Sequence, residues 1–594
     1  MIFFGLASFL LIIMFACIGG YYSKKLSIRN SFFFNIVAGL LIFSIINIFI
    51  NFFTSLHSIT YYLIILSVLI FSLKEIKFIN YNEFLYSLLF CLFASLLSYK
   101  MQPGYDAGLY HFPFQSWISN EKIAFGLNNL NHRFSITSLY SYWSAPLWIG
   151  KSPIMLITLQ VCMYAIFFLY LFNLINSKFT VLKILSFATV ISFPLWYRYQ
   201  VPTYGLTDTA YGIFLFICII SYIHNYLIVD YKKNIPNSDL FNILTLSSMV
   251  IALKPSGLLI IIFLLIGFYI FKKKIMVDKK ILILPLFFLT CWYVKNIIIS
   301  SCLNPILKFT CIKTQWYNAD YVDMLQQQLL EWREKIFVSN DYFQDLLIIQ
   351  LFIFILVVSF LIRLVKKYKN SNNLSNIIKS KKIIIRFLLV IVYLLAITQF
   401  QKLEGYYQNL DIVGADFSKK IIKTEINNIF TFNLVCLIAL YFFFYKKIKL
   451  NSNYFYIMSD KFPLIYLIFC FTLWLINVAD PRLAYGYFAL LLPLIIFTFN
   501  SLITKYSNED YKKSFIIVFF FILNITNNLQ IKNIFDIDYI FPPEVNYTVR
   551  KEYGNKPDLK KNNLCWMTKD CYYYEKDLQK EKFFYNYYIL KLKN

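Results

Sequence analysis

The sequence predicts an all-α fold, a polytopic bundle of about sixteen transmembrane helices with external loops and a small external C-terminal segment. Hydrophobic residues make up 59% of the 594 residues and charged residues only 15%, which is more apolar surface than a soluble protein of this length can bury. Apolar runs of about 20 residues recur along the chain, and each is long enough to cross a bilayer core of roughly 30 Å.

The predicted spans divide the chain into a membrane domain at residues 1–529 and an external segment at 530–594. We expect the first apolar run to be a span rather than a signal peptide, because no basic segment precedes it and no small-residue cleavage site follows it. The shortest spans could be half-helices. The spans are 2–22, 32–53, 59–73, 84–99, 153–175, 180–197, 209–229, 240–253, 257–271, 281–299, 345–364, 384–400, 429–445, 463–478, 484–503 and 515–529.

Lysines and arginines collect in every second loop, from Lys24 and Lys25 at the start of the chain to Lys512 and Lys513 near its end. The positive-inside rule makes these loops cytoplasmic. Both termini and the long loops 100–152, 300–344 and 401–428 are then external. The net charge of +26 does not indicate nucleic-acid binding, because the basic residues are dispersed among loops rather than gathered on one soluble domain.

Four of the eleven cysteines lie in loops that the charge rule makes external, and they form two close pairs. Because the external side is oxidising, we predict the disulfides Cys302–Cys311 and Cys565–Cys571, with free thiols as the alternative. The abundance of Asn, Ile, Lys, Phe and Tyr is typical of a bacterium with an AT-rich genome. The expected location is therefore a bacterial inner (plasma) membrane, with the functional site on the periplasmic side.

The first long external loop carries the densest group of polar side chains. Asp106 follows the fourth span by seven residues, so we expect it at the membrane–water boundary. A carboxylate there can take a proton from a hydroxyl group. The candidate residues that follow it in the loop are Tyr110, His111, Asn129, His132 and Arg133. The alternative is a loop that only packs on the bundle.

Other polar residues lie at the external ends of spans, and the ionisable ones among them are functional candidates because charge at membrane depth is costly. Together they suit a phosphate or pyrophosphate that enters from the bilayer. The alternative for each lysine is snorkelling to the headgroups. No soluble-enzyme motif or metal-spaced cluster is present, and Asp208 could be a second carboxylate for a divalent metal. These residues are Asp208, Lys254, Lys295, Asn296 and Arg482.

The motif Asp106-Ala107-Gly108-Leu109-Tyr110-His111 and the segment 129–133 resemble the signature of an uncharacterised bacterial family of polytopic membrane proteins. Ala107 stands where that family usually has Thr, and Asn131 is an extra residue before His132. The family is similar to GT-C glycosyltransferases, which use a sugar linked to a polyprenyl phosphate. The resemblance implies that Asp106 is the catalytic base and Asp208 a second acidic site residue. In GT-C enzymes, however, the catalytic loop usually follows the first span.

These observations lead to three functional hypotheses. The first is a membrane glycosyltransferase that moves a sugar from a polyprenyl-phosphate donor to a glycan, lipid or protein acceptor on the external face. The second is an O-antigen or polysaccharide polymerase or ligase, which would rely on Arg482 and His132 rather than on a carboxylate base. The third is a transporter or flippase of a lipid-linked solute, which would need charge at mid-membrane and often has internal repeats. Membrane lipids are expected partners in all three.

Overall fold

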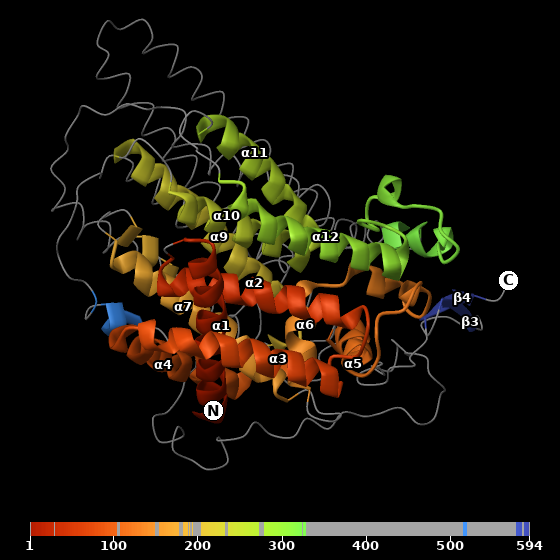
Figure 1. Cartoon of the computed structure of the whole chain (residues 1–594), viewed down its shortest axis with the longest axis horizontal. Helices are drawn as coiled ribbons and strands as arrows, with labels where there is room; N and C mark the ends of the chain where they lie inside the picture. Colours follow the sequence, from red (N-terminus) through yellow and green to blue (C-terminus); the bar gives the residue numbers. More distant parts are fainter. Residues whose placement is uncertain are drawn as a thin grey trace, which may run out of the picture.

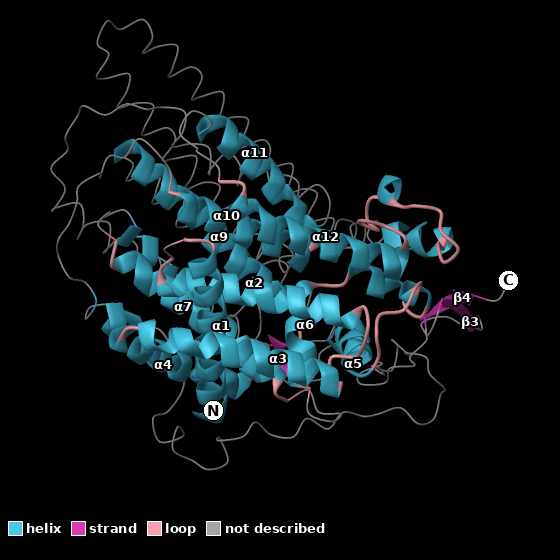
Figure 2. Ribbon diagram, in the orientation of Figure 1, coloured by secondary structure: helices cyan, strands magenta, loops and turns pink. Residues whose placement is uncertain are grey.

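The computed structural model describes most of the first 327 residues and short pieces near the C-terminus. The described residues are 2–327 except 29, 104–106, 149–153, 178–181, 232–235, 272–277, 324 and several positions between 184 and 202, together with 512, 515–519, 578–584 and 587–592. Most of them are helical, and the helices lie together in one bundle (Figures 1 and 2). The predicted helical character of the membrane domain is confirmed over this part of the chain.

The bundle is built from long helices joined by turns and by one large excursion between α4 and α7. The long helices are α1 (Ile2–Lys25), α2 (Phe32–Asn51), α3 (Ile59–Ser72), α4 (Tyr81–Ser95), α7 (Leu156–Ile175), α9 (Asp208–Tyr231), α10 (Asn237–Leu253), α11 (Leu259–Phe271) and α12 (Lys280–Ser300). The excursion contains the short helices α5 (Phe112–Asn120), η4 (Leu127–Asn129), η5 (His132–Ile136) and α6 (Leu139–Ser144).

Six described segments are long and apolar enough to cross a membrane. They are Ile2–Lys25, Phe32–Asn51, Ile59–Phe78, Tyr81–Ser98, Leu156–Ile175 and Lys280–Ser300. Each corresponds to a predicted span. The segment Ile59–Phe78, predicted to be short, reaches spanning length because the 3₁₀ helix η1 (Leu73–Phe78) continues α3. The predicted spans between 345 and 503 lie outside the described residues.

The helices occupy different depths in the bundle. Nearly all of the most apolar stretch of α7 is buried, whereas little of the corresponding stretch of α3 is buried. The exposed face of α3 carries large apolar side chains, among them Leu63, Leu66 and Ile70. Exposed apolar side chains along a segment of spanning length are expected to contact lipid rather than water. We therefore infer that α7 is a central helix and that α3 lies at the lipid boundary.

Four short strands add to the helices, so the chain is not helical throughout. Strand β1 (Gln102–Pro103) pairs in parallel with β2 (Thr203–Tyr204), and β3 (Leu578–Phe584) pairs antiparallel with β4 (Tyr587–Leu592). The β3–β4 hairpin belongs to the predicted C-terminal segment, and β4 lies next to η4 (Figure 1). The hairpin therefore lies on the same side as the loop between α4 and α7.

The described parts of the segments predicted to be external lie together at one end of the bundle. The turn between α2 and α3 donates backbone hydrogen bonds to the loop at 100–152, from Leu56 N to Ile118 O (3.1 Å) and from His57 N to Ser119 O (3.0 Å). Two predicted cytoplasmic loops also contact each other, through an ion pair between Lys24 and Glu75 at 3.4 Å. Helices α2 and α3 each run between a predicted external segment and a predicted cytoplasmic loop. These external and cytoplasmic segments therefore lie on opposite faces of the bundle.

Candidate functional site

The candidate site lies where α9, α10 and α12 end beneath the loop between α4 and α7. Asp208 is the first residue of α9, where a carboxylate interacts favourably with the helix dipole. Lys254 directly follows α10 in an extended conformation, because the next residue is Pro255 and a residue before proline disfavours the helical region. Lys295 and Asn296 lie near the C-terminal end of α12. Tertiary packing brings these three ends together.

Asp208 and Lys254 form an ion pair, and their side chains are 13% and 10% exposed. The Lys254 ammonium also lies 5.6 Å from the centre of the Tyr211 ring. In the part of the chain that the structure describes, the Asp208 carboxylate is the only polar partner of Lys254 Nζ. Because a lysine has three N–H donors, this leaves donor capacity for a further acceptor.

Lys295 is completely buried, with no exposed surface. Its Nζ donates a hydrogen bond to Thr137 Oγ1 at 2.6 Å and lies 3.5 Å from the centre of the Trp292 ring and 5.9 Å from that of Tyr142. Among the described residues no carboxylate forms an ion pair with it. A hydroxyl and two aromatic rings compensate a buried charge only partly.

A small cavity of about 30 Å³ is lined by Lys254, and it adjoins Lys295 only through Thr137 and Trp292, which contact Lys295 and form part of the wall. Lys254, Thr137 and Asn296 all contribute to its wall, together with Trp292 and Asn304. This volume is enough for a water molecule or two, since one water needs roughly 10–15 Å³. It is much smaller than the clefts of roughly 300–1,000 Å³ that enclose drug-sized ligands.

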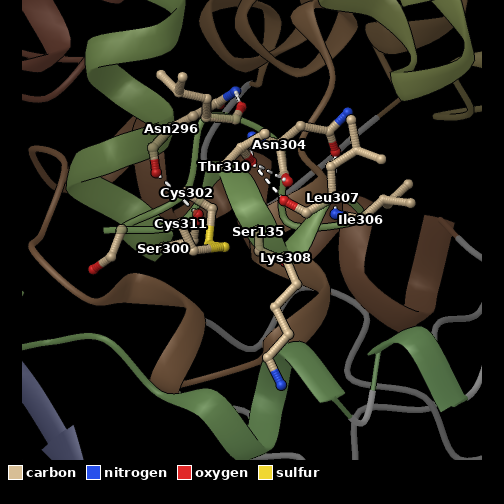
Figure 3. Close-up of a disulfide and its surroundings, with 12 residues drawn as sticks. Ser135, Asn296, Ser300, Cys302, Asn304, Ile306, Leu307, Lys308, Thr310 and Cys311 are labelled. Atoms are coloured by element: carbon tan, nitrogen blue, oxygen red, sulfur yellow. Dashed lines mark hydrogen bonds between the residues drawn. A yellow bond between two sulfur atoms is a disulfide. The ribbon is translucent and has the colours of Figure 1, made fainter. Parts of the chain in front are cut away.

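The disulfide Cys302–Cys311 holds one wall of this cavity, and the sequence prediction of this pair is confirmed. Asn296 Nδ2 donates to the carbonyl of Leu303 at 2.9 Å, and Thr310 Oγ1 donates to the carbonyl of Asn304 at 2.7 Å (Figure 3). The loop that the disulfide closes is therefore tied both to α12 and across itself. Asn304 and Pro305 are fixed beside Asn296 in this way.

The other described candidate residues form a second group in the loop between α4 and α7. The Arg133 guanidinium lies 5.5 Å from the ring centre of Tyr110, whose ring in turn is 4.2 Å from that of His111. His132 is buried, with its ring 6.4 Å from that of Tyr321. Helix η5 links the two groups, because His132 and Arg133 stand at its start and Ser135 and Ile136 at its end line the cavity.

Tyr321 joins the loop at 300–327 to the second group. Its hydroxyl donates a hydrogen bond to the carbonyl of Asn129 at 3.4 Å. Burial and, to a lesser extent, the charge of Asp320 raise the pKa of Tyr321 to about 12, so the hydroxyl stays protonated at neutral pH. Asn129 also donates from Nδ2 to the carbonyl of Trp316 at 3.3 Å. Asn129 is thus held by two contacts to one neighbouring loop.

The segment that follows α4 lies beside the segment that precedes Asp208. Strand pairing matches Pro103 with Tyr204, and the next residue, Gly205, has a positive φ of 83°. A Cβ added at Gly205 would lie 2.3 Å from the Phe112 ring and 3.1 Å from Cβ of Ala107. Glycine is therefore required here both by the backbone conformation and by the close approach of the loop.

Four of the predicted residues lie outside the described part of the chain: Asp106, Arg482, Cys565 and Cys571. Sequence reasoning did not identify Thr137, Trp292 or Asn304, because none belongs to a motif and each reaches the site only through folding. Within the described residues, no group of three or more His, Cys, Asp or Glu side chains could hold a metal ion.

Comparison with known proteins gives one match. Residues 1–400 match the model of a family described as a domain of unknown function (DUF8201). No curated protein and no solved structure matches the chain.

Proposed function

We propose that this chain, which belongs to the DUF8201 family, is a membrane glycosyltransferase of the GT-C type. The proposed donor is a sugar on a polyprenyl phosphate, and the proposed acceptor is a glycan, lipid or protein on the external face. The observation that carries the proposal is the completely buried Lys295, which has no carboxylate partner among the described residues and lies beside a cavity lined by Lys254.

A phosphate oxygen would provide the missing anionic partner once the cavity widens, because the cavity now holds only a water molecule or two and Thr137 and Trp292 separate it from Lys295. Lys254 lines the cavity, and Asn296 contributes a polar side chain from the next turn of α12 after Trp292. Charge-assisted hydrogen bonds to phosphate are about twice as strong as neutral ones, and their strength increases away from water. A lipid-linked donor reaches the end of a membrane helix from the bilayer itself. A soluble nucleotide sugar would have to enter from the aqueous side.

In the proposed reaction, the acceptor hydroxyl oxygen attacks the anomeric carbon of the donor sugar. The bond between that carbon and the phosphate oxygen breaks, and its electron pair leaves with the phosphate. Asp106 takes the hydroxyl proton, and Lys295, Lys254 and Arg482 stabilise the charge of the departing phosphate. His111, His132 and Arg133 would orient donor or acceptor. Asp208 is assigned to positioning Lys254, with which it forms an ion pair.

Asp106 itself lies outside the described residues, so its role as base is a prediction. Support comes from its described neighbours in sequence. Ala107, the residue after Asp106, lies against Gly205, which is three residues before Asp208. Pro103 pairs with Tyr204. A divalent metal stays a prediction too, and the pairing of Asp208 with Lys254 leaves that carboxylate less available as a ligand.

The alternatives differ in which residues they require. A polysaccharide polymerase or ligase would use a similar donor but would need Arg482 and His132 and tolerate loss of Asp106. A transporter would place charge midway across the bilayer. Lys254 and Asp208 are instead at helix ends, which favours a reaction at the membrane boundary.

The test separates donor binding from transfer in the full-length protein reconstituted in proteoliposomes. The binding probe is a polyprenyl phosphate without sugar, and the control variant is Lys313→Met, an exposed lysine on the same face. Lys295→Met preserves the apolar volume, and we expect it to weaken binding at least tenfold, in line with loss of a charge-assisted hydrogen bond. Unchanged affinity would overturn the phosphate site.

Asp106→Asn is expected to bind the polyprenyl phosphate normally and to lose transfer. The readout is sugar transferred to surface glycan in cells that express the variant at the wild-type level. Normal glycan in these cells would contradict the role of Asp106. Loss of transfer in Arg482 and His132 variants, with Asp106→Asn active, would support the polymerase or ligase instead.

A further inference from the structure

A second cavity lies on the opposite face, where the end of α1 meets η1. Its volume is about 370 Å³. It is lined by Lys24 and Lys25 from the last turn of α1, and by Lys74, Glu75 and Lys77 from η1. Four lysines thus face one carboxylate. We call this cavity, with Tyr21 and Phe78 as its aromatic walls, the lysine cleft.

Aromatic rings lie against three of the four lysines. Lys24 Nζ lies 4.7 Å and Lys77 Nζ 5.2 Å from the centre of the Phe78 ring, and Lys25 Nζ lies 4.7 Å from that of Tyr21. Glu75 pairs with Lys24, so it does not neutralise the other three lysines directly. The cleft keeps an excess of positive charge that is partly ordered before any anion binds.

The lysine cleft opens next to α3, the least buried of the six described candidate spans. Helix α3 leads directly into η1, and Leu66, Ile70 and Phe71 on α3 are each more than half exposed. The positive-inside rule assigns this face to the cytoplasm, where the leaflet is rich in anionic lipid. A phosphate in the cleft could therefore carry acyl chains that run along the exposed face of α3. A free phosphate would make no use of that apolar face.

We propose that the lysine cleft binds the phosphate headgroup of an anionic phospholipid of the cytoplasmic leaflet. The volume is suited to a headgroup, since ligand sites typically measure roughly 300–1,000 Å³. Four cations at the membrane surface supply the attraction, and the aromatic walls reduce the entropy lost on binding. The site is separate from the candidate glycosyltransferase site and does not depend on it.

The test measures lipid binding to the full-length protein in neutral detergent by native mass spectrometry. The probes are phosphatidylglycerol and phosphatidylcholine. The test variant is K74Q/K77Q, which leaves the Lys24–Glu75 pair intact. The matched control is K279Q/K280Q, which removes two exposed lysines predicted to lie on the same face but outside the cleft. K74R/K77R, which keeps the charge, shows whether the lysines act through charge or through packing.

We expect wild type and both K279Q/K280Q and K74R/K77R to bind phosphatidylglycerol in preference to phosphatidylcholine. K74Q/K77Q should bind phosphatidylglycerol about tenfold more weakly, a conservative figure for two surface lysines. Equal loss in the control would overturn the proposal, as would equal binding of phosphatidylcholine or loss of binding in K74R/K77R. Displacement of the lipid by an equal concentration of inorganic phosphate would show that the cleft takes a soluble anion instead.

Discussion

At the scale of single residues, the two lysines of the candidate site differ in how their charge is compensated. Lys254 has a carboxylate partner in Asp208, whereas Lys295 relies on Thr137 and aromatic rings. An ion pair that is mostly removed from water is costly to break, because the remaining charge loses its partner. This difference predicts that the two lysines respond differently to substitution.

Breaking the Asp208–Lys254 pair should destabilise the protein through the charge that is left behind. We expect Asp208→Asn and Lys254→Met each to lower the free energy of unfolding by about 3 kcal/mol. The double variant should be more stable than the sum of these losses predicts. Thermal unfolding of the purified protein measures all three. Additive losses would contradict a direct interaction, since independent sites add.

Gly205 is expected to be sensitive to any side chain. A Cβ there would lie 2.3 Å from the Phe112 ring, at a φ of 83°. We expect Gly205→Ala to destabilise the protein by about 1–3 kcal/mol and to raise amide exchange across residues 107–112. Adding Phe112→Leu should restore part of the stability, because it removes the ring that the new methyl group would meet. If Phe112→Leu restores no stability, the loss caused by Gly205→Ala comes from backbone strain alone.

At the scale of elements, α1 and α2 are joined by an unusually close contact. A Cβ at Gly19 would lie 1.9 Å from the carbonyl oxygen of Asn35, and a Cβ at Gly39 would lie 1.9 Å from that of Phe15. Small residues allow helix backbones to approach in membranes, where packing rather than the hydrophobic effect holds helices together. The two glycines therefore set the distance between these helices.

Gly39→Ala should force α1 and α2 apart and lower the thermal stability of the purified protein. The added methyl group would meet backbone atoms, which cannot move aside as a flexible side chain can. The matched control is Gly20→Ala in the same helix pair. The nearest atom to its new Cβ is the side-chain nitrogen Nδ2 of Asn35 at 3.5 Å, which is an ordinary contact. Similar melting temperatures for the two variants would disprove the close contact.

At the scale of the whole molecule, the described segments sort into two faces. One face holds the candidate site, the disulfide loop and the β3–β4 hairpin, and the other holds the lysine cleft. The alternation of basic loops predicts that the first face is external. The hairpin beside η4 agrees with the predicted placement of the C-terminal segment on the same side as the loop at 100–152.

Cysteine accessibility in intact cells tests this arrangement. Asn120→Cys and Lys279→Cys introduce thiols at exposed positions on the two faces. We expect a membrane-impermeant maleimide to label Asn120→Cys in intact cells and Lys279→Cys only after permeabilisation. The native cysteines among the described residues are buried or disulfide-bonded, so the maleimide should label them only weakly. The reverse pattern would invert the predicted orientation.

A helical membrane protein, the approximate position of six spans and the Cys302–Cys311 disulfide could all be predicted from the sequence. These follow from local patterns, namely apolar runs, loop charge and cysteines nine residues apart. The folded structure was needed to show that Asp208 pairs with Lys254, that Thr137 contacts Lys295 across 158 residues of sequence, and that α1 and α2 meet at Gly19 and Gly39. Such contacts depend on how whole helices pack, and no local pattern encodes which helix ends become neighbours.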